Sequence, residues 1–141
     1  MATLDSSIVN IVLPTLTKSF GVDLHQVKWV VVIYLLVITC LLLPFGRISD
    51  QFGRKPIFLL GFFVFSFGSA LCAMAPTLPL LVAARAVQAI GAAFLMANGP
   101  AIITAAFPSN ERGSALGVMA MVVSAGLISG PTIGGLLVST V

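Results

Sequence analysis

The sequence predicts an all-α, polytopic transmembrane helical bundle. Of its 141 residues, 59% are hydrophobic and 8% are charged, and the mean hydropathy is +1.16. A soluble domain carries about 25% charged residues, so this composition is typical of a membrane protein. Several apolar runs approach or exceed the roughly 20 residues that a helix needs to cross a bilayer. Because lipid cannot satisfy backbone polar groups, such runs are expected to be helical.

The apolar runs define the expected helices in chain order. A short first run covers residues 1–16, and the complete runs that follow are 28–45, 56–75, 79–107 and 113–138. The short connections predict antiparallel neighbours in a compact bundle. The run 79–107 exceeds the bilayer thickness, so tilt and a kink at Gly99-Pro100 are expected. Residues 1–141 are therefore assigned to one transmembrane domain.

The basic residues predict the orientation of the bundle. Four lie on one side of the expected membrane and two on the other: Arg47, Arg54, Lys55 and Arg112 against Lys18 and Lys28. The positive-inside rule places the loop 46–55 in the cytoplasm of a multi-pass cell-membrane protein. The net charge of +3 does not indicate nucleic-acid binding, because the basic residues lie at helix ends rather than on one solvated face.

Neither an enzyme active site nor a metal site is expected. Cys40 and Cys72 lie in apolar runs without metal-ligand spacing and are interpreted as small buried hydrophobic residues. The sequence shows no set of nucleophile, base and acid and no phosphate-binding loop. The sequence therefore predicts a protein that is not an enzyme and needs no cofactor.

The last apolar run is unusually rich in glycine. Between residues 117 and 135 it carries five glycines and one proline: Gly117, Gly126, Gly130, Pro131, Gly134 and Gly135. Each interior glycine costs a helix about 1 kcal/mol relative to alanine, so the cluster requires a reason. Three of these glycines recur every fourth residue and form one smooth stripe, beside which Pro131 is expected to bend the helix. Two explanations are open: close helix packing, and a bent helix at a moving interface of a transporter.

Arg85 is a charged residue inside an apolar run. It lies six residues after Pro79, or about 9 Å below the expected surface at 1.5 Å per residue. An arginine at mid-membrane costs about 2.5–3.5 kcal/mol on insertion scales. Snorkelling to the outer interface is one explanation. Ala84, Gln88 and Gly91 give the surrounding face a small, polar character, which favours functional burial in the bundle or a watery cavity.

Asp5 is the one acidic residue within an apolar run, and Asn10 follows it. If the first run ends near Lys18, Asp5 lies about 20 Å from the outer surface, whereas Arg85 lies about 9 Å from it. Direct pairing of the two is therefore strained. Asp5 is interpreted as a candidate proton or cation site with its partner left open, and a frayed cytoplasmic helix end is the alternative.

The segment 46–55 contains an acid that topology does not explain. As a positive-inside turn, the segment would use Gly46 and Gly53 for tight backbone. Acids contribute little to topology, so Asp50 needs another role. Its carboxylate could pair with Arg54 four residues later or face the N-terminus of another helix.

Four motifs, in order, resemble those of the major facilitator superfamily. Leu4–Pro14 resembles the first-helix motif of its fourteen-helix drug:proton antiporters. The cytoplasmic loop between helices 2 and 3 is matched by the residues Gly46, Asp50, Gly53, Arg54 and Lys55, and Gln51 departs from a usual basic residue. Arg85–Ala93 resembles the helix-4 motif, in which the arginine is associated with proton coupling, and Ala89 replaces a common glycine. The glycines and proline of residues 117–135 resemble the helix-5 motif that is specific to exporters.

The resemblance implies that the chain is part of the N-terminal half of such a transporter, with a partial helix 1 and helices 2–5. It implies proton-coupled export of drugs or other small lipophilic molecules, often cationic, by alternating access between two six-helix halves. Proton coupling or cavity roles then fall to Asp5, Asn10, Arg85 and Gln88, and the glycine–proline helix would shape the interface between the halves. By the same analogy, Asp50 and Arg54 would hold one gating state through a helix of the C-terminal half, which is the expected protein partner.

Only four residues precede Asp5, where the family has about a dozen, so the chain is expected to be a fragment that does not transport alone. Proton-driven drug efflux by the 141-residue chain in vesicles would contradict that expectation. Two alternatives remain. One is an uptake carrier for another small solute, and the other is a small membrane interaction protein that uses its glycine-rich helix face.

Overall fold

The computed structural model describes Val9 and residues 13–140. Residues 13–20 are helical, and four further helices follow: α2 (Leu24–Phe52), α3 (Arg54–Ala73), α4 (Leu78–Ala106) and α5 (Arg112–Thr140). Each of the four includes a stretch that is long and apolar enough to cross a membrane. The described part of the chain contains no strand. The predicted all-α transmembrane bundle is therefore confirmed.

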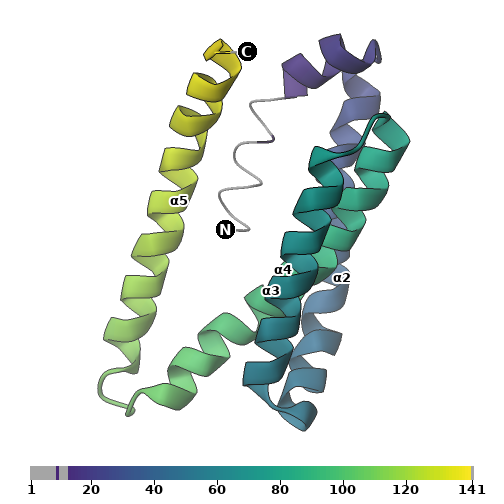
Figure 1. Ribbon diagram of the computed structural model, residues 1–141. Helices are drawn as coiled ribbons and strands as arrows, with labels where there is room; N and C mark the ends of the chain where they lie inside the picture. The colour runs from purple at the N-terminus through teal and green to yellow at the C-terminus, as the bar shows by residue number, and fades with distance from the viewer. Residues whose placement is uncertain (1–8, 10–12, 141) are drawn as a thin grey trace.

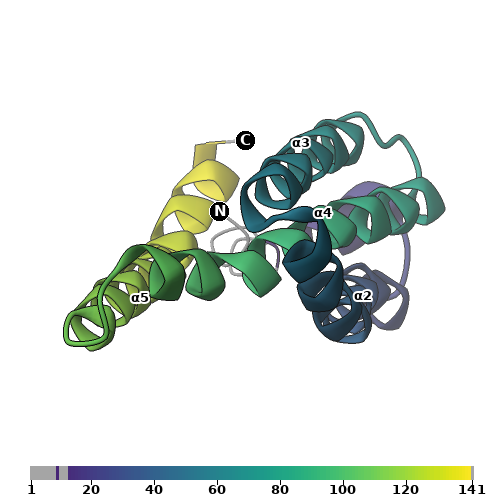
Figure 2. The ribbon, with the colours of Figure 1, turned by 90° about the horizontal axis from the view of Figure 1, so that it is seen from below.

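Helix α4 organises the bundle. It packs against α2 and α3, and its later part leans away from them towards α5, which stands apart from that pair (Figures 1 and 2). Half of the most apolar stretch of α4 is buried, compared with 17% in α2 and in α3. Pro100 lies inside α4 and removes one backbone donor from the helix. The arrangement places the side chains of α4 where a buried site could form.

The connection between α2 and α3 differs from the expected loop 46–55. Helix α2 continues through Gly46 to Phe52, and α3 begins at Arg54. Between Gly46 and Gly53 no proline or glycine interrupts the helix, so the turn is delayed to Gly53. Gly53 has φ 93°, a backbone conformation that side-chain-bearing residues rarely adopt. The tight turn expected at Gly46 was therefore wrong, whereas the one expected at Gly53 is present.

Glycines let α3 and α4 approach each other closely. A Cβ added at Gly68 would lie 2.6 Å from Gln88 Cα, and one added at Gly61 would lie 2.5 Å from Phe94 Cβ. A Cβ added at Gly91 would collide with the backbone of Phe65. Gly61 and Gly68 are two helical turns apart, so both present the same face to α4. Small residues at such a crossing allow the backbone contact that stabilises helices in lipid.

Two clusters of side chains complete the core. Tyr34, Ile38 and Phe65 pack with alanines of α4, and the rings of Phe45 and Phe94 stack with centroids 3.7 Å apart. Val9, Val30 and Leu81 form the second cluster, which lies near the N-terminal end of α2. The core thus joins α2, α3 and α4.

The glycine-rich helix α5 has a different environment. Gly130 is buried and Gly126 is half-buried, whereas Cβ atoms added at Gly117 and Gly135 would meet nothing within 4 Å. Pro131 is exposed, and the helix continues through it and through Gly134 to Thr140. Within the described part of α5, burial is thus found at Gly126 and Gly130 of the stripe, whereas Gly117 and Gly135, outside the stripe, face open space.

Candidate functional site

Arg85 lies on the buried face of α4. Its side chain is 8% exposed, and its guanidinium carbon lies 5.9 Å from the centre of the Tyr34 ring on α2. At this distance the positive charge gains from the negative face of the ring. The guanidinium thus faces the bundle, as the small, polar neighbourhood predicted, and not the lipid.

A chain of hydrogen bonds connects Arg85 to α3. Arg85 Nη1 donates to Gln88 Oε1 at 2.9 Å, and Gln88 Nε2 donates to Ser69 Oγ at 2.8 Å. Ser69 Oγ in turn donates to the backbone oxygen of Phe65 at 2.9 Å. Cys72 Sγ lies 3.8 Å from Gln88 Oε1, in donor geometry. Gln88 is 1% exposed, so its amide is satisfied by protein groups in place of water.

Sequence reasoning missed the α3 half of this network. It singled out Arg85 and Gln88, which are three residues apart on one helix, but neither Ser69 nor Tyr34. It interpreted Cys72 as a small hydrophobic residue, and the structure adds the thiol contact with Gln88. One signal was available: Ser69 follows Gly68, and a small residue beside a polar one is typical of a membrane helix interface.

The other two residues predicted for the cavity, Asp5 and Asn10, lie outside the described residues. Val9 is described, and with Tyr34 and Arg85 it lines a hollow of about 10 Å³. That volume is near the lower limit for a single water molecule. Val9 and Arg85 therefore line the same small hollow.

Two of the predicted gating residues, Asp50 and Arg54, form a joint with α4 at one end of the bundle. Arg54 Nε and Nη2 donate to Asp50 Oδ1 at 3.2 and 3.0 Å, and Arg54 Nη1 donates to the Ala101 oxygen at 2.7 Å. The ion pair predicted between residues four apart is thus present, and the structure adds α4 as a third participant. Gly46 and Lys55 make no contact in this set of bonds. The Asp50 side chain is 62% exposed, which leaves most of the carboxylate open to further contacts.

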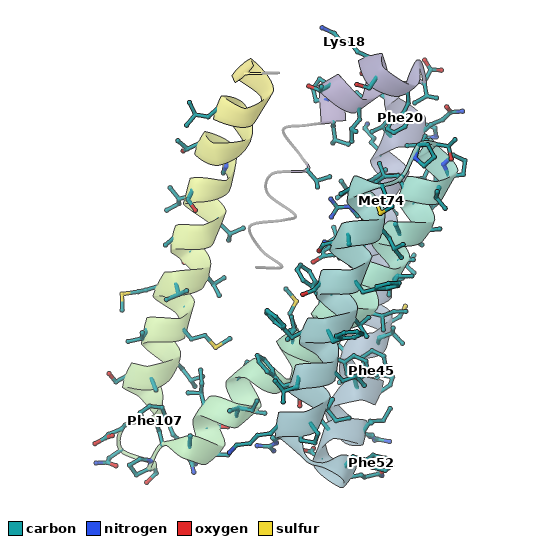
Figure 3. The ribbon with its side chains drawn as sticks, viewed as in Figure 1. Lys18, Phe20, Phe45, Phe52, Met74 and Phe107 are labelled. Atoms are coloured by element: carbon teal, nitrogen blue, oxygen red, sulfur yellow. The ribbon has the colours of Figure 1, made fainter. Side chains whose placement is uncertain are left out.

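The two groups of basic residues that predict topology lie at opposite ends. Figure 3 shows Lys18 at one end of the molecule, and Phe52 and Phe107 at the other. Arg54 follows Phe52 closely in sequence, and Arg112 Nε donates to the Phe107 oxygen at 3.1 Å. The geometry agrees with the charge separation used in the prediction, and the cytoplasmic placement of the 46–55 segment remains a prediction.

Asn98 is a further buried polar residue that sequence reasoning did not single out. Its side chain is 0% exposed, and Nδ2 donates to the Phe94 oxygen at 2.7 Å. Its Oδ1 has no hydrogen-bond partner within the part of the chain that the structure describes. Burial of an amide oxygen in this way opposes folding by about 1–3 kcal/mol.

The chain matches the family model described as Major Facilitator Superfamily over residues 1–141. It is 46% identical over 137 residues to the riboflavin transporter RibZ of Clostridioides difficile, covering 97% of this chain and 30% of that protein. It is 37% identical over 139 residues to the multidrug resistance protein Stp of Mycobacterium tuberculosis, covering 98% of this chain and 26% of Stp. A methylenomycin A resistance protein of Bacillus subtilis is 39% identical over 139 residues, with 98% and 30% covered.

Four helices that are long and apolar enough to cross a membrane define the class of the chain as a polytopic membrane protein. The match across all 141 residues then establishes the family: the chain belongs to the major facilitator superfamily. It spans about 30% of the length of the riboflavin transporter and of the methylenomycin resistance protein. The resemblance expected from the four motifs is confirmed at the level of the family, whose members include multidrug resistance proteins.

Proposed function

We propose that this chain forms part of a proton-coupled exporter of small lipophilic molecules in the cell membrane. The observation that carries the proposal is the buried guanidinium of Arg85, held by Gln88 inside α4. A guanidinium is permanently charged, so it cannot release the transported proton itself. It can favour the ionised form of a nearby carboxylate and so control when that carboxylate takes up a proton.

Asp5 is the proposed proton-carrying acid, and Arg85 would act on it across the shared cavity and not through a direct ion pair. It is the one acidic residue in an apolar run, and acidic residues within membrane spans are rare and mark ion pathways or proton relays. Asn10 and Gln88 are proposed to line the same cavity. The resistance proteins among the relatives support a drug as the substrate, in the lipophilic and often cationic class.

The cytoplasmic joint supplies the proposed gate. The exposed Asp50 carboxylate, together with Gly53, Arg54 and Lys55, is available to a helix of the second half of the transporter, while Arg54 stays anchored to α4. Alternating access would then make and break contacts at Asp50. The partner half, the direction of transport and the proton gradient as its energy source belong to the proposal.

Everted vesicles that contain the full-length transporter test the coupling. A lipophilic cationic dye should accumulate when the lumen is acidified, and an uncoupler should abolish the accumulation. Arg85→Ala should remove this proton-dependent accumulation. Arg112→Ala is the matched control, because it removes an exposed arginine that bonds only to a neighbouring backbone oxygen among the described groups. Unchanged dye accumulation in Arg85→Ala would contradict the coupling role.

Transport of riboflavin is a second candidate function. The observation in its favour is the 46% identity to a riboflavin transporter. Riboflavin is a polar vitamin, so it differs from a lipophilic cation in the side chains that would recognise it. Cells that express the full-length protein distinguish the candidates. Riboflavin transport without a change in dye efflux or drug resistance would favour the second candidate over the first.

A further inference from the structure

We infer that Ser69, on α3, is a positioning residue that sets the direction of the Arg85 guanidinium through Gln88. The inference rests on the proposed function and deepens it. It proposes that α3, which lies outside the motif of Arg85, orients the charge that is used in proton coupling. Ser69 touches neither a proton carrier nor a substrate in the proposal. It acts through the amide between it and the arginine.

The polarity of the hydrogen bonds fixes how the amide lies. A guanidinium can only donate, so Gln88 must turn its carbonyl oxygen towards Arg85. The amide nitrogen then faces α3, where it needs an acceptor, and Ser69 Oγ accepts at 2.8 Å. Ser69 has one proton, which it donates to the Phe65 oxygen. Each group therefore has one consistent role, and reversing the amide would set two donors against each other.

The close helix crossing puts Ser69 within reach. Gly68 allows the α3 backbone to approach Gln88 so closely that an added Cβ would lie 2.6 Å from both Gln88 N and Cα. Phe65, which supplies the terminal acceptor, packs against Gly91 one helical turn further along α4. Helix packing thus sets the distance from the α3 backbone to the Gln88 amide, and this distance brings the Ser69 hydroxyl within hydrogen-bond reach of Gln88.

Removal of the Ser69 hydroxyl leaves Gln88 Nε2 without its acceptor in a site where Gln88 is 1% exposed. An unsatisfied buried donor costs about 1–3 kcal/mol, which is comparable to the bond between Arg85 and Gln88, so Gln88 no longer holds its carbonyl oxygen in one position at Arg85. The guanidinium keeps its charge, but the hydrogen bond that aligns it with the Gln88 carbonyl oxygen is weakened. The proton-coupled step should suffer, whereas substrate exchange that needs no proton movement should not.

The test uses the full-length transporter with Ser69→Ala, Ser69→Thr and Gln88→Leu. Ser69→Ala should lower proton-driven export about tenfold, the effect of one buried hydrogen bond, and shift its pH profile. Substrate counterflow at equal pH should stay unchanged. Ser69→Thr keeps the hydroxyl and should retain the wild-type export rate and pH profile. In the Gln88→Leu background, Ser69→Ala should change nothing further.

Three results would overturn the inference: wild-type export and pH profile in Ser69→Ala, equal losses of export and counterflow, or a further loss in the Gln88→Leu background. A second measurement separates this failure from failure of the proposed function. In a background with Cys72 as the sole cysteine, Ser69→Ala should raise the rate of Cys72 alkylation roughly two- to tenfold, because Gln88 Oε1 leaves the thiol. That increase with uncoupler-insensitive transport would refute proton coupling and keep the positioning role, and no increase would refute the positioning role.

Discussion

The α3–α4 pair and α5 use their glycines in opposite ways. In the pair, added Cβ atoms at Gly61, Gly68 and Gly91 would collide with the facing helix. In α5, Cβ atoms at Gly117 and Gly135 would meet nothing within 4 Å. The glycines of the α3–α4 pair are needed for close packing inside the bundle, whereas Gly117 and Gly135 of α5 are not. A glycine in an apolar helix therefore identifies a close contact only when its partner is known.

The largest expected effect is at Gly91. A side chain there meets the Phe65 backbone, which cannot rotate away, so Gly91→Ala should destabilise the full-length protein by about 1–3 kcal/mol and Gly91→Leu by more. Thermal unfolding in detergent measures the loss. The matched control is Gly46→Ala, which changes a helical glycine with nothing within 4 Å of its added Cβ. Equal stability of Gly91→Leu and the wild type would contradict the close crossing.

A smaller effect is expected at the joint of the three helices. Arg54→Ala removes the bond to the Ala101 oxygen and should cost about 1 kcal/mol of stability. Arg47→Ala is the control, because Arg47 is an exposed arginine on the same end of α2. Chemical unfolding of the two variants side by side provides the comparison. An equal loss of stability in both variants would show that the positive charge at this end contributes to stability and that the bond to the Ala101 oxygen does not.

Asp50→Asn should have less effect on stability than Arg54→Ala. The ion pair is exposed, and exposed pairs contribute about 0–1 kcal/mol. Transport should be affected more than stability if the carboxylate contacts the second half of the transporter. Unfolding and dye accumulation measured on the same preparation test this difference. A loss of stability larger than that of Arg54→Ala would mean that Asp50 is mainly structural.

The smallest effect is expected at Gly117. Gly117→Ala adds a methyl group to open space and favours the helix by up to about 1 kcal/mol, so stability should hold or rise slightly. Thermal unfolding and dye accumulation should be recorded together. Unchanged stability with lost transport would place Gly117 at a moving interface. Destabilisation as large as that of Gly91→Ala would instead show close packing against a part of the transporter outside the described residues.

The burial of Arg85 could be predicted because its cost in lipid is high and its neighbours at helical spacing are small or polar. The network around it could not. Ser69 and Gln88 are 19 residues apart, and their contact depends on the crossing of α3 and α4. The turn at Gly46 was mispredicted for a related reason: a glycine permits a turn but does not require one. Helix α2 continued to the next glycine, where the backbone has φ 93°.

The sequence by itself determined the apolar helices, the family and the position of one charge inside a membrane span. Composition and spacing suffice for these, because lipid penalises every unsatisfied polar group along a single helix. Only the tertiary structure decided which glycines bring helices together and which polar groups meet. Those choices depend on how α4 crosses its neighbours, and that crossing is a property of three packed helices that no one segment contains.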